Sequence, residues 1–202
     1  MKTYRSTREV AARARQALDA ASPTSLGPSA LEQVAEILHQ SRHYFWVGIF
    51  LVLGDKAVRY AAAGPQTSCS AMELGHGNVG TAAASGALKV SADVSRDATY
   101  VQCFAEVKSE LVAPIRLGTQ VFGVLDLESD QLGGFGEEER ILAKQVAADV
   151  ARFLAGRGRY IVRRARRDAG LEVPAPRAST PRPQPQSEKP ESGIPRGEKA
   201  HA

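Results

Sequence analysis

Two cysteines are the residues of this sequence whose chemistry is most distinctive. Cys69 and Cys103 are the only cysteines among 202 residues, and 34 positions separate them. Two cysteines are too few for a disulfide scaffold in a chain of this size. We interpret them either as a catalytic or redox pair or as two small apolar residues of the core. No metal is expected, because the sequence has no CxxC and no histidine at ligand spacing from either cysteine.

Three acidic residues form a second group that could do chemistry. Asp126 and Glu128 lie two residues apart in an apolar run, so both side chains project from one face of a strand. Across the expected hairpin they face Glu110. Burying carboxylates in apolar strands is costly unless they bind a partner or share protons. We therefore weigh a binding or proton-transfer cluster against three strand-end residues that stay in water.

A glycine-rich segment lies between the two cysteines. Gly75, Gly77 and Gly80 match the pattern G-x-G-x-x-G, which invites a phosphate-binding interpretation. However, no Lys-Ser or Lys-Thr pair follows, and the segment lies between antiparallel elements rather than in a βαβ unit. We therefore favour a tight turn at the mouth of a ligand pocket, where glycine serves the backbone shape.

The elements that must position these residues alternate between helical and strand patterns. Helices are predicted over 7–20 and from Ser29, and a long closing helix from Phe135 to about Arg164. Strands are predicted over 44–53, 57–63, 66–74, 89–94, 109–117 and 120–129, and a short helix opens within 75–86. The third of these strands would carry Cys69. The pattern predicts an α+β fold in which helices flank an antiparallel sheet.

Charge and composition divide the chain into four segments. Residues 1–28 form a basic helical arm, 29–150 a folded domain, 151–167 the basic end of the C-terminal helix, and 168–202 a proline-rich tail that is predicted to be disordered. Residues 23–150 hold fifteen acidic and nine basic residues, which argues against nucleic-acid binding by the domain itself. Residues 151–167 contain seven arginines and no acid, and we favour a solvated helix end over a phosphate- or nucleic-acid-binding patch.

The same composition bears on location. No apolar run approaches the roughly 20 residues that a bilayer-spanning helix needs. The N-terminus is basic but has neither the apolar core nor the small-residue cleavage site of a secretory signal. A cytoplasmic protein without a membrane contact is therefore expected.

Several motifs together resemble a known family over about residues 29–150. The motifs are Trp46-Val-Gly-Ile-Phe50, Cys69, Gly75-His-Gly-Asn-Val-Gly-Thr-Ala82, Asp93-Val94, Cys103, Ser109-Glu-Leu-Val-Ala-Pro-Ile115 and Gly123-Val-Leu-Asp-Leu-Glu-Ser129. In order and spacing they resemble the GAF-domain free methionine-(R)-sulfoxide reductases. The resemblance implies a GAF-like, six-stranded antiparallel sheet, and an enzyme that reduces free L-methionine (R)-sulfoxide with electrons from thioredoxin.

The resemblance also implies roles for individual residues. Cys103 falls on the nucleophile and Cys69 on the cysteine that resolves it. Trp46 falls on the aromatic residue that packs against the methyl-sulfur end of the substrate, with Phe50 nearby. The carboxylates that hold the ammonium and sulfoxide groups of the substrate are expected at Glu110, Asp126 and Glu128, with Glu110 counted among the catalytic residues. The family usually has a third cysteine where Val79 stands, Asp where Glu128 stands, and Tyr where Phe50 stands.

The residue types suit this chemistry. A carboxyl group with a raised pKa can protonate the sulfoxide oxygen while a thiolate attacks sulfur. The resulting sulfenic acid on Cys103 would condense with Cys69 to a disulfide. We therefore expect the two thiols and the three carboxyl groups to share one cavity sized for an amino acid.

An alternative of a different class stays open, a non-catalytic GAF module that binds a small ligand and signals through its terminal helices. No cofactor is expected in either case. A homodimer is expected as the common soluble assembly.

Overall fold

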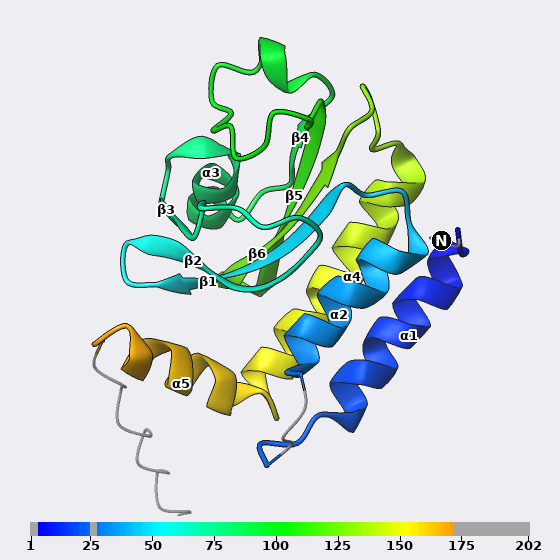
Figure 1. The fold of residues 1–202 in the computed structure, drawn as a ribbon. Helices are drawn as coiled ribbons and strands as arrows, with labels where there is room; N and C mark the ends of the chain where they lie inside the picture. The colour runs from blue at the N-terminus through cyan, green and yellow to red at the C-terminus, as the bar shows by residue number, and fades with distance from the viewer. Residues whose placement is uncertain (1–3, 25–27, 172–202) are drawn as a thin grey trace, which may run out of the picture.

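The computed structural model describes residues 4–24 and 28–171, which are built around one six-stranded antiparallel sheet (Figure 1). The strand order across the sheet is β3-β2-β1-β6-β5-β4. The strands are β1 (Trp46–Leu53), β2 (Lys56–Ala63), β3 (Ala71–Glu73), β4 (Lys89–Ser91), β5 (Ser109–Leu117) and β6 (Gln120–Ser129). The hairpins β1–β2 and β5–β6 meet at the centre, where β1 pairs with β6. The predicted α+β architecture is confirmed.

Two helices, α2 (Ala30–Ser41) and α4 (Glu137–Ala155), cover one face of the sheet (Figure 1). A third helix, α1 (Thr7–Ala20), packs against both of them on the side away from the sheet. Val47, Ile49 and Leu51 of β1 are buried in the apolar core beneath them. Because side chains alternate between the faces of a strand, the residues between these three must point to the other face.

The opposite face carries α3 (Gly77–Ser85), the short 3₁₀ turn Val94–Arg96 and the segment 97–108 (Figure 1). Trp46 and Phe50 point to this side and belong to a second, smaller apolar cluster. Gly48 lies between them, and a Cβ atom there would lie 2.3 Å from the Trp46 ring. The glycine therefore lets the indole lie flat across β1, where it forms a wall for whatever the second face encloses.

Local sequence signals explain where the helices begin. Ser29 accepts a hydrogen bond from the backbone N–H of Glu32, and the Glu32 side chain accepts one from the N–H of Ser29. This capping box fixes the start of α2 at the predicted position. The helix α4 begins with Glu137, Glu138 and Glu139, whose charges suit the positive end of the helix dipole.

Three elements differ from their predictions. The strand predicted over 89–94 ends at Ser91, and the 3₁₀ turn Val94–Arg96 follows it. The strand predicted over 66–74 is confined to β3, so Cys69 lies in the preceding loop instead of within a strand. The helix predicted to continue to about Arg164 ends at Ala155, and a separate α5 (Arg159–Asp168) follows. A Cβ atom at Gly158 would lie 2.5 Å from the Phe153 ring, so the chain turns closely around that ring where a continuous helix was expected.

The remaining basic segment forms α5, which buries Ile161 and Ala165 and exposes most of its arginines. The tail from residue 172, which we expect to be disordered, lies outside the described residues. In the part of the chain that is described, no helix is both long and apolar enough to cross a bilayer.

Candidate active site

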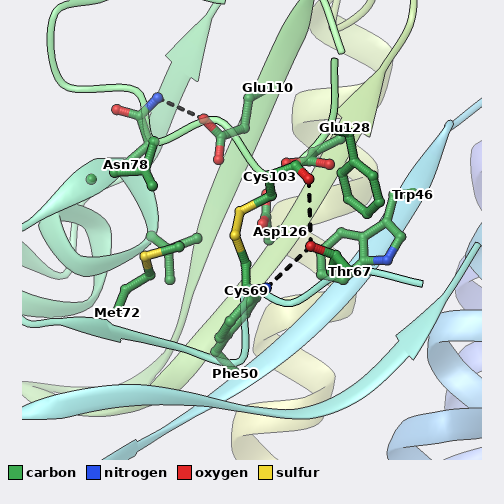
Figure 2. Close-up of a pocket in the computed structure, with 14 residues that line it drawn as sticks. Trp46, Phe50, Thr67, Cys69, Met72, Asn78, Cys103, Glu110, Asp126 and Glu128 are labelled. Atoms are coloured by element: carbon green, nitrogen blue, oxygen red, sulfur yellow. Dashed lines mark hydrogen bonds between the residues drawn. A yellow bond between two sulfur atoms is a disulfide. The ribbon is translucent and has the colours of Figure 1, made fainter. Parts of the chain in front are cut away.

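The three acidic residues come together on the second face of the sheet (Figure 2). Glu110 of β5 pairs directly with Glu128 of β6, and Asp126 lies two residues along the same strand. Their exposed fractions are 4%, 2% and 3%, respectively. The carboxylate oxygens lie within 4.8 Å of one another. The prediction that they form one cluster is confirmed, and the alternative that they are strand ends in water is wrong.

Burial makes this cluster hold protons. It raises the pKa of Glu110 to about 7 and that of Glu128 to about 8, because an apolar surrounding penalises the charged form. The pKa of Asp126 lies well above its usual value, first through burial and then through the charges of the other two carboxyl groups. Oδ1 of Asp126 and Oε2 of Glu128 are buried without a hydrogen-bond partner among the described residues. The cluster is therefore suited to receive a cation or to give up a proton.

Cys69 and Cys103 form a disulfide beside the carboxyl groups (Figure 2). Their Cα atoms are 5.9 Å apart, although the residues come from two separate loops. Thr67 ties these loops together, because its hydroxyl accepts a hydrogen bond from the N–H of Cys69 at 3.2 Å and donates one to the carbonyl of Cys103 at 3.5 Å. The two cysteines are thus a bonded pair at the pocket wall and not separate core residues.

An apolar wall completes the pocket. Trp46 and Phe50 are buried at 3% and 2% exposure, and their rings lie 6.3 Å apart. Val79 of α3 lines the same pocket, at the position where the resembled family usually has a third cysteine. Met72 and Phe104 also line it. All eight residues singled out from the sequence, Trp46, Phe50, Cys69, Val79, Cys103, Glu110, Asp126 and Glu128, therefore line one cavity.

The cavity is smaller than we expected. Its free volume is about 10 Å³, close to the minimum that one water molecule needs, so an amino acid does not fit. The disulfide joins the loops of Cys69 and Cys103 at the wall of this cavity (Figure 2). The expectation of a cavity sized for an amino acid is therefore not met in the disulfide-bonded state.

Sequence analysis missed several polar residues of this site. Asn78 of α3 donates a hydrogen bond to Glu110 at 2.6 Å and another to Asp97 at 3.1 Å. The hydroxyl of Tyr100 is buried and finds no acceptor within the described part of the chain, and burial together with the charge of Glu128 raises its pKa. These contacts join segments far apart in the sequence, and nothing in the glycine-rich segment distinguishes Asn78 from its polar neighbours His76 and Thr81.

The cluster of carboxyl groups is also where a cation could sit. Their oxygen ligands lie close enough together to surround one positive centre, which could be a metal ion or an ammonium group. The apolar wall of Trp46 and Phe50 beside the cluster suits an organic cation whose other end is apolar.

Comparison with known proteins identifies the architecture. The GAF domain family model matches residues 28–154. GAF domain-containing protein A of Dictyostelium discoideum is 30% identical over 115 residues, which is 56% of this chain and 73% of the relative. The free methionine-R-sulfoxide reductase of Escherichia coli is 31% identical over 110 residues, which is 54% of this chain and 66% of the relative.

A solved structure agrees in fold. The free methionine-R-sulfoxide reductase from Neisseria meningitidis, in complex with its substrate, superimposes with a TM-score of 0.67 at 24% identity. The match covers 84% of this chain and 99% of that one. At this identity the likeness concerns the fold, and the function must be argued from the pocket.

Proposed function

Because the chain belongs to the GAF domain family, we propose that its pocket is a catalytic site that reduces free L-methionine (R)-sulfoxide to methionine. One observation carries the proposal: the disulfide between Cys69 and Cys103 borders the same cavity as Glu110, Asp126 and Glu128. The similarity to reductases with this activity supports the choice of substrate.

The cluster suits the amino-acid end of such a substrate. A free amino acid carries an ammonium group, and two buried carboxylate oxygens of the cluster lack a partner. In a buried site an opposite charge stabilises the ionised carboxylate far more than it does in water. A methionine within a peptide lacks this ammonium group, so the site favours the free amino acid. Trp46 and Phe50 offer an apolar surface to the methyl-sulfur end.

The reaction begins from the reduced thiols. The Cys103 thiolate attacks the sulfoxide sulfur while a carboxyl group of the cluster, for which we propose Glu110, protonates the oxygen. The oxygen passes to Cys103, so methionine leaves and Cys103 becomes a sulfenic acid. The Cys69 thiol then displaces water from this sulfenic acid and forms the disulfide that the structure contains. An external dithiol, which we propose to be thioredoxin, reduces this disulfide by thiol–disulfide exchange. Both thiols are restored and the external dithiol becomes a disulfide.

The test follows single turnovers of the reduced protein, without added reductant, on both epimers of free methionine sulfoxide. We expect about one methionine per chain from the (R)-epimer, together with formation of the Cys69–Cys103 disulfide. Cys103→Ser is expected to yield none. Cys69→Ser is expected to give the same single turnover but to turn over slowly with thioredoxin.

The opposite outcome is equally definite. If the reduced wild-type protein leaves the (R)-epimer unchanged but still binds a small amino acid, the pocket belongs to a ligand-binding GAF module. Thioredoxin as the reductant and a homodimer remain proposals that the purified protein can test by coupled assay and by sedimentation. A cytoplasmic location also remains a proposal, which fractionation of cells that contain the protein can test.

A further inference from the structure

Asn78 occupies a position in which every polar atom of its side chain is used. It lies at the beginning of α3 and is 2% exposed. Its amide nitrogen donates to Oε2 of Glu110 at 2.6 Å and to Oδ2 of Asp97 at 3.1 Å. Its carbonyl oxygen accepts a hydrogen bond from the Thr99 hydroxyl at 2.8 Å. An amide has two N–H donors and one acceptor oxygen, so both of its hydrogens and its oxygen are engaged.

The orientation of this amide follows from its partners. Asp97 also accepts hydrogen bonds from the backbone N–H of Thr99 at 3.0 Å and from Ser91 of β4; burial acts against them, but the hydrogen bonds lower its pKa to about 2. An ionised Asp97 can only accept, so the amide nitrogen of Asn78 must face it. The second N–H of that nitrogen then points at Glu110, whose Oε2 is forced to act as an acceptor (Figure 2).

We propose that Asn78, held between Asp97 and Glu110, is a positioning residue that fixes the orientation of the Glu110 carboxyl group and makes it the member of the cluster that gives up its proton first. The catalytic effect of Asn78 rests on the proposed function. The hydrogen bonds of Asn78 and their effect on the proton of Glu110 do not depend on it.

The neighbours of Glu110 agree with this assignment. Burial raises the pKa of Glu110, and the Asn78 hydrogen bond acts against burial because it stabilises the ionised form. For Asp126 burial is the first cause of a raised pKa and the charge of Glu110 the second, so an ionised Glu110 favours a protonated Asp126.

The other charges that face Glu110 come from three elements. The titratable and charged groups around it are Asp126 and Glu128 from β6, Lys89 from β4, and Asp97 and Tyr100 from the segment that follows the 3₁₀ turn. Lys89 lowers the pKa of Glu110 and Asp97 raises it. Asn78, by contrast, is uncharged and donates a hydrogen bond to Glu110. Replacing Asn78 by an apolar residue therefore removes stabilisation of the ionised Glu110 without changing the net charge of the site.

This placement matters for the proposed reaction. A general acid works best when its pKa lies near the ambient pH, because it must both hold a proton and release it. Burial raises the pKa of Glu110, and the hydrogen bond from Asn78 opposes that rise. Asp97 and Thr99 keep Asn78 in place.

The test measures the protonation of Glu110 directly, by ¹³C NMR of its side-chain carboxyl in the oxidised protein, assigned with Glu110→Gln. Asn78→Val removes the donor at nearly constant volume, and we expect the midpoint of Glu110 to rise by about one unit or more. Thr99→Val, at an exposed position, loosens Asn78 without entering the cluster and should raise the midpoint by less. Thr81→Val removes a hydroxyl elsewhere on α3 and should leave the midpoint unchanged.

The kinetic counterpart separates positioning from simple loss of structure. In Asn78→Val, the alkaline limb of the rate profile should move to higher pH by the same amount as the NMR midpoint, while a merely structural defect lowers the rate equally at every pH. If both the Asn78 and the Thr99 variant fold normally and the titration midpoint of Glu110 is unchanged in both, the proposal is overturned. A shifted midpoint in a protein without sulfoxide reductase activity overturns the proposed function and leaves the role of Asn78 standing.

Discussion

Three carboxyl groups that keep their protons inside the fold link stability to pH. Glu110, Asp126 and Glu128 have raised pKa values in the folded protein, whereas in the unfolded chain they ionise at ordinary values. Below those ordinary values both states are protonated, and the full stability is present. As the pH rises, the unfolded chain loses protons first, which favours unfolding.

We therefore predict that the free energy of unfolding falls between about pH 4.5 and pH 8, by an amount on the order of a few kcal/mol. Urea titrations across this range measure the effect. Glu128→Gln should flatten the decline, because an amide does not titrate. The exposed Glu106→Gln serves as the matched control and should follow the wild-type curve. A stability that rises over the same range contradicts the burial of three protonated carboxyl groups.

Among the site residues, the sequence predicted those whose positions follow from the spacing within one strand or one hairpin. The two-residue spacing of Asp126 and Glu128 sets a shared face by strand geometry alone, and the hairpin adds Glu110. Asn78 and Tyr100 could not be found in this way. Their partners lie on other elements, and nothing in the local pattern distinguishes a buried Asn in a glycine-rich segment from one in a turn.

Among the elements, the loops that carry the cysteines decide whether the pocket is open. Long hydrogen-bonded ladders between β1, β6 and β5 fix the sheet beneath these loops. A change in pocket volume must therefore come from a movement of the loops. The two loops are joined by the disulfide and by the hydroxyl of Thr67. Reduction leaves the weaker of these links, a hydrogen bond at 3.5 Å.

We predict that only the reduced protein binds free methionine, the product of the proposed reaction. Trp46 is the one tryptophan of the chain and lines the pocket, so its fluorescence reports occupancy without a label. Methionine should change this fluorescence in the reduced protein and leave it constant in the oxidised protein, whose cavity holds about one water molecule. Equal responses in both redox states would mean that the pocket opens without breaking the disulfide.

The sequence predicted elements well where a periodic pattern extends over a whole hairpin or helix, as for β5, β6 and α2. It failed where tertiary contacts interrupt the pattern. A strand is predicted over 66–74, but only Ala71, Met72 and Glu73 pair with β2. The helix expected to reach about Arg164 breaks because Gly158 packs against Phe153, a contact that periodicity does not reveal.

Over the whole molecule, one buried arginine adds a polar link between the N-terminal helix and two other helices. Arg42, at the end of α2, is 1% exposed and donates to Thr7 of α1 at 2.8 Å and to Glu138 of α4 at 3.1 Å. Its guanidinium also lies 4.4 Å from the centre of the Tyr4 ring. One side chain therefore joins α2 to α1 and to α4, which lies about a hundred residues further along the chain.

Arg42→Ala should lower the free energy of unfolding by about 2–4 kcal/mol, since it removes these bonds and leaves a cavity in their place. Amide hydrogen exchange in α1 should accelerate more than in β5 and β6, because α1 loses the anchor while the sheet does not. Arg8→Ala, an exposed arginine on α1, should change stability by no more than about 0.5 kcal/mol. Equal effects of the two substitutions would show that Arg42 is not an anchor.

The disulfide also makes part of the chain a covalent ring. Residues 69–103 are closed on themselves in the oxidised protein, and Lys89 and Arg96 lie inside that ring. A single tryptic nick at either residue therefore leaves the two fragments joined, and they migrate as one band on a gel until a reductant is added. Gel mobility after limited digestion thus reads the redox state of the pocket from the connectivity of the chain itself.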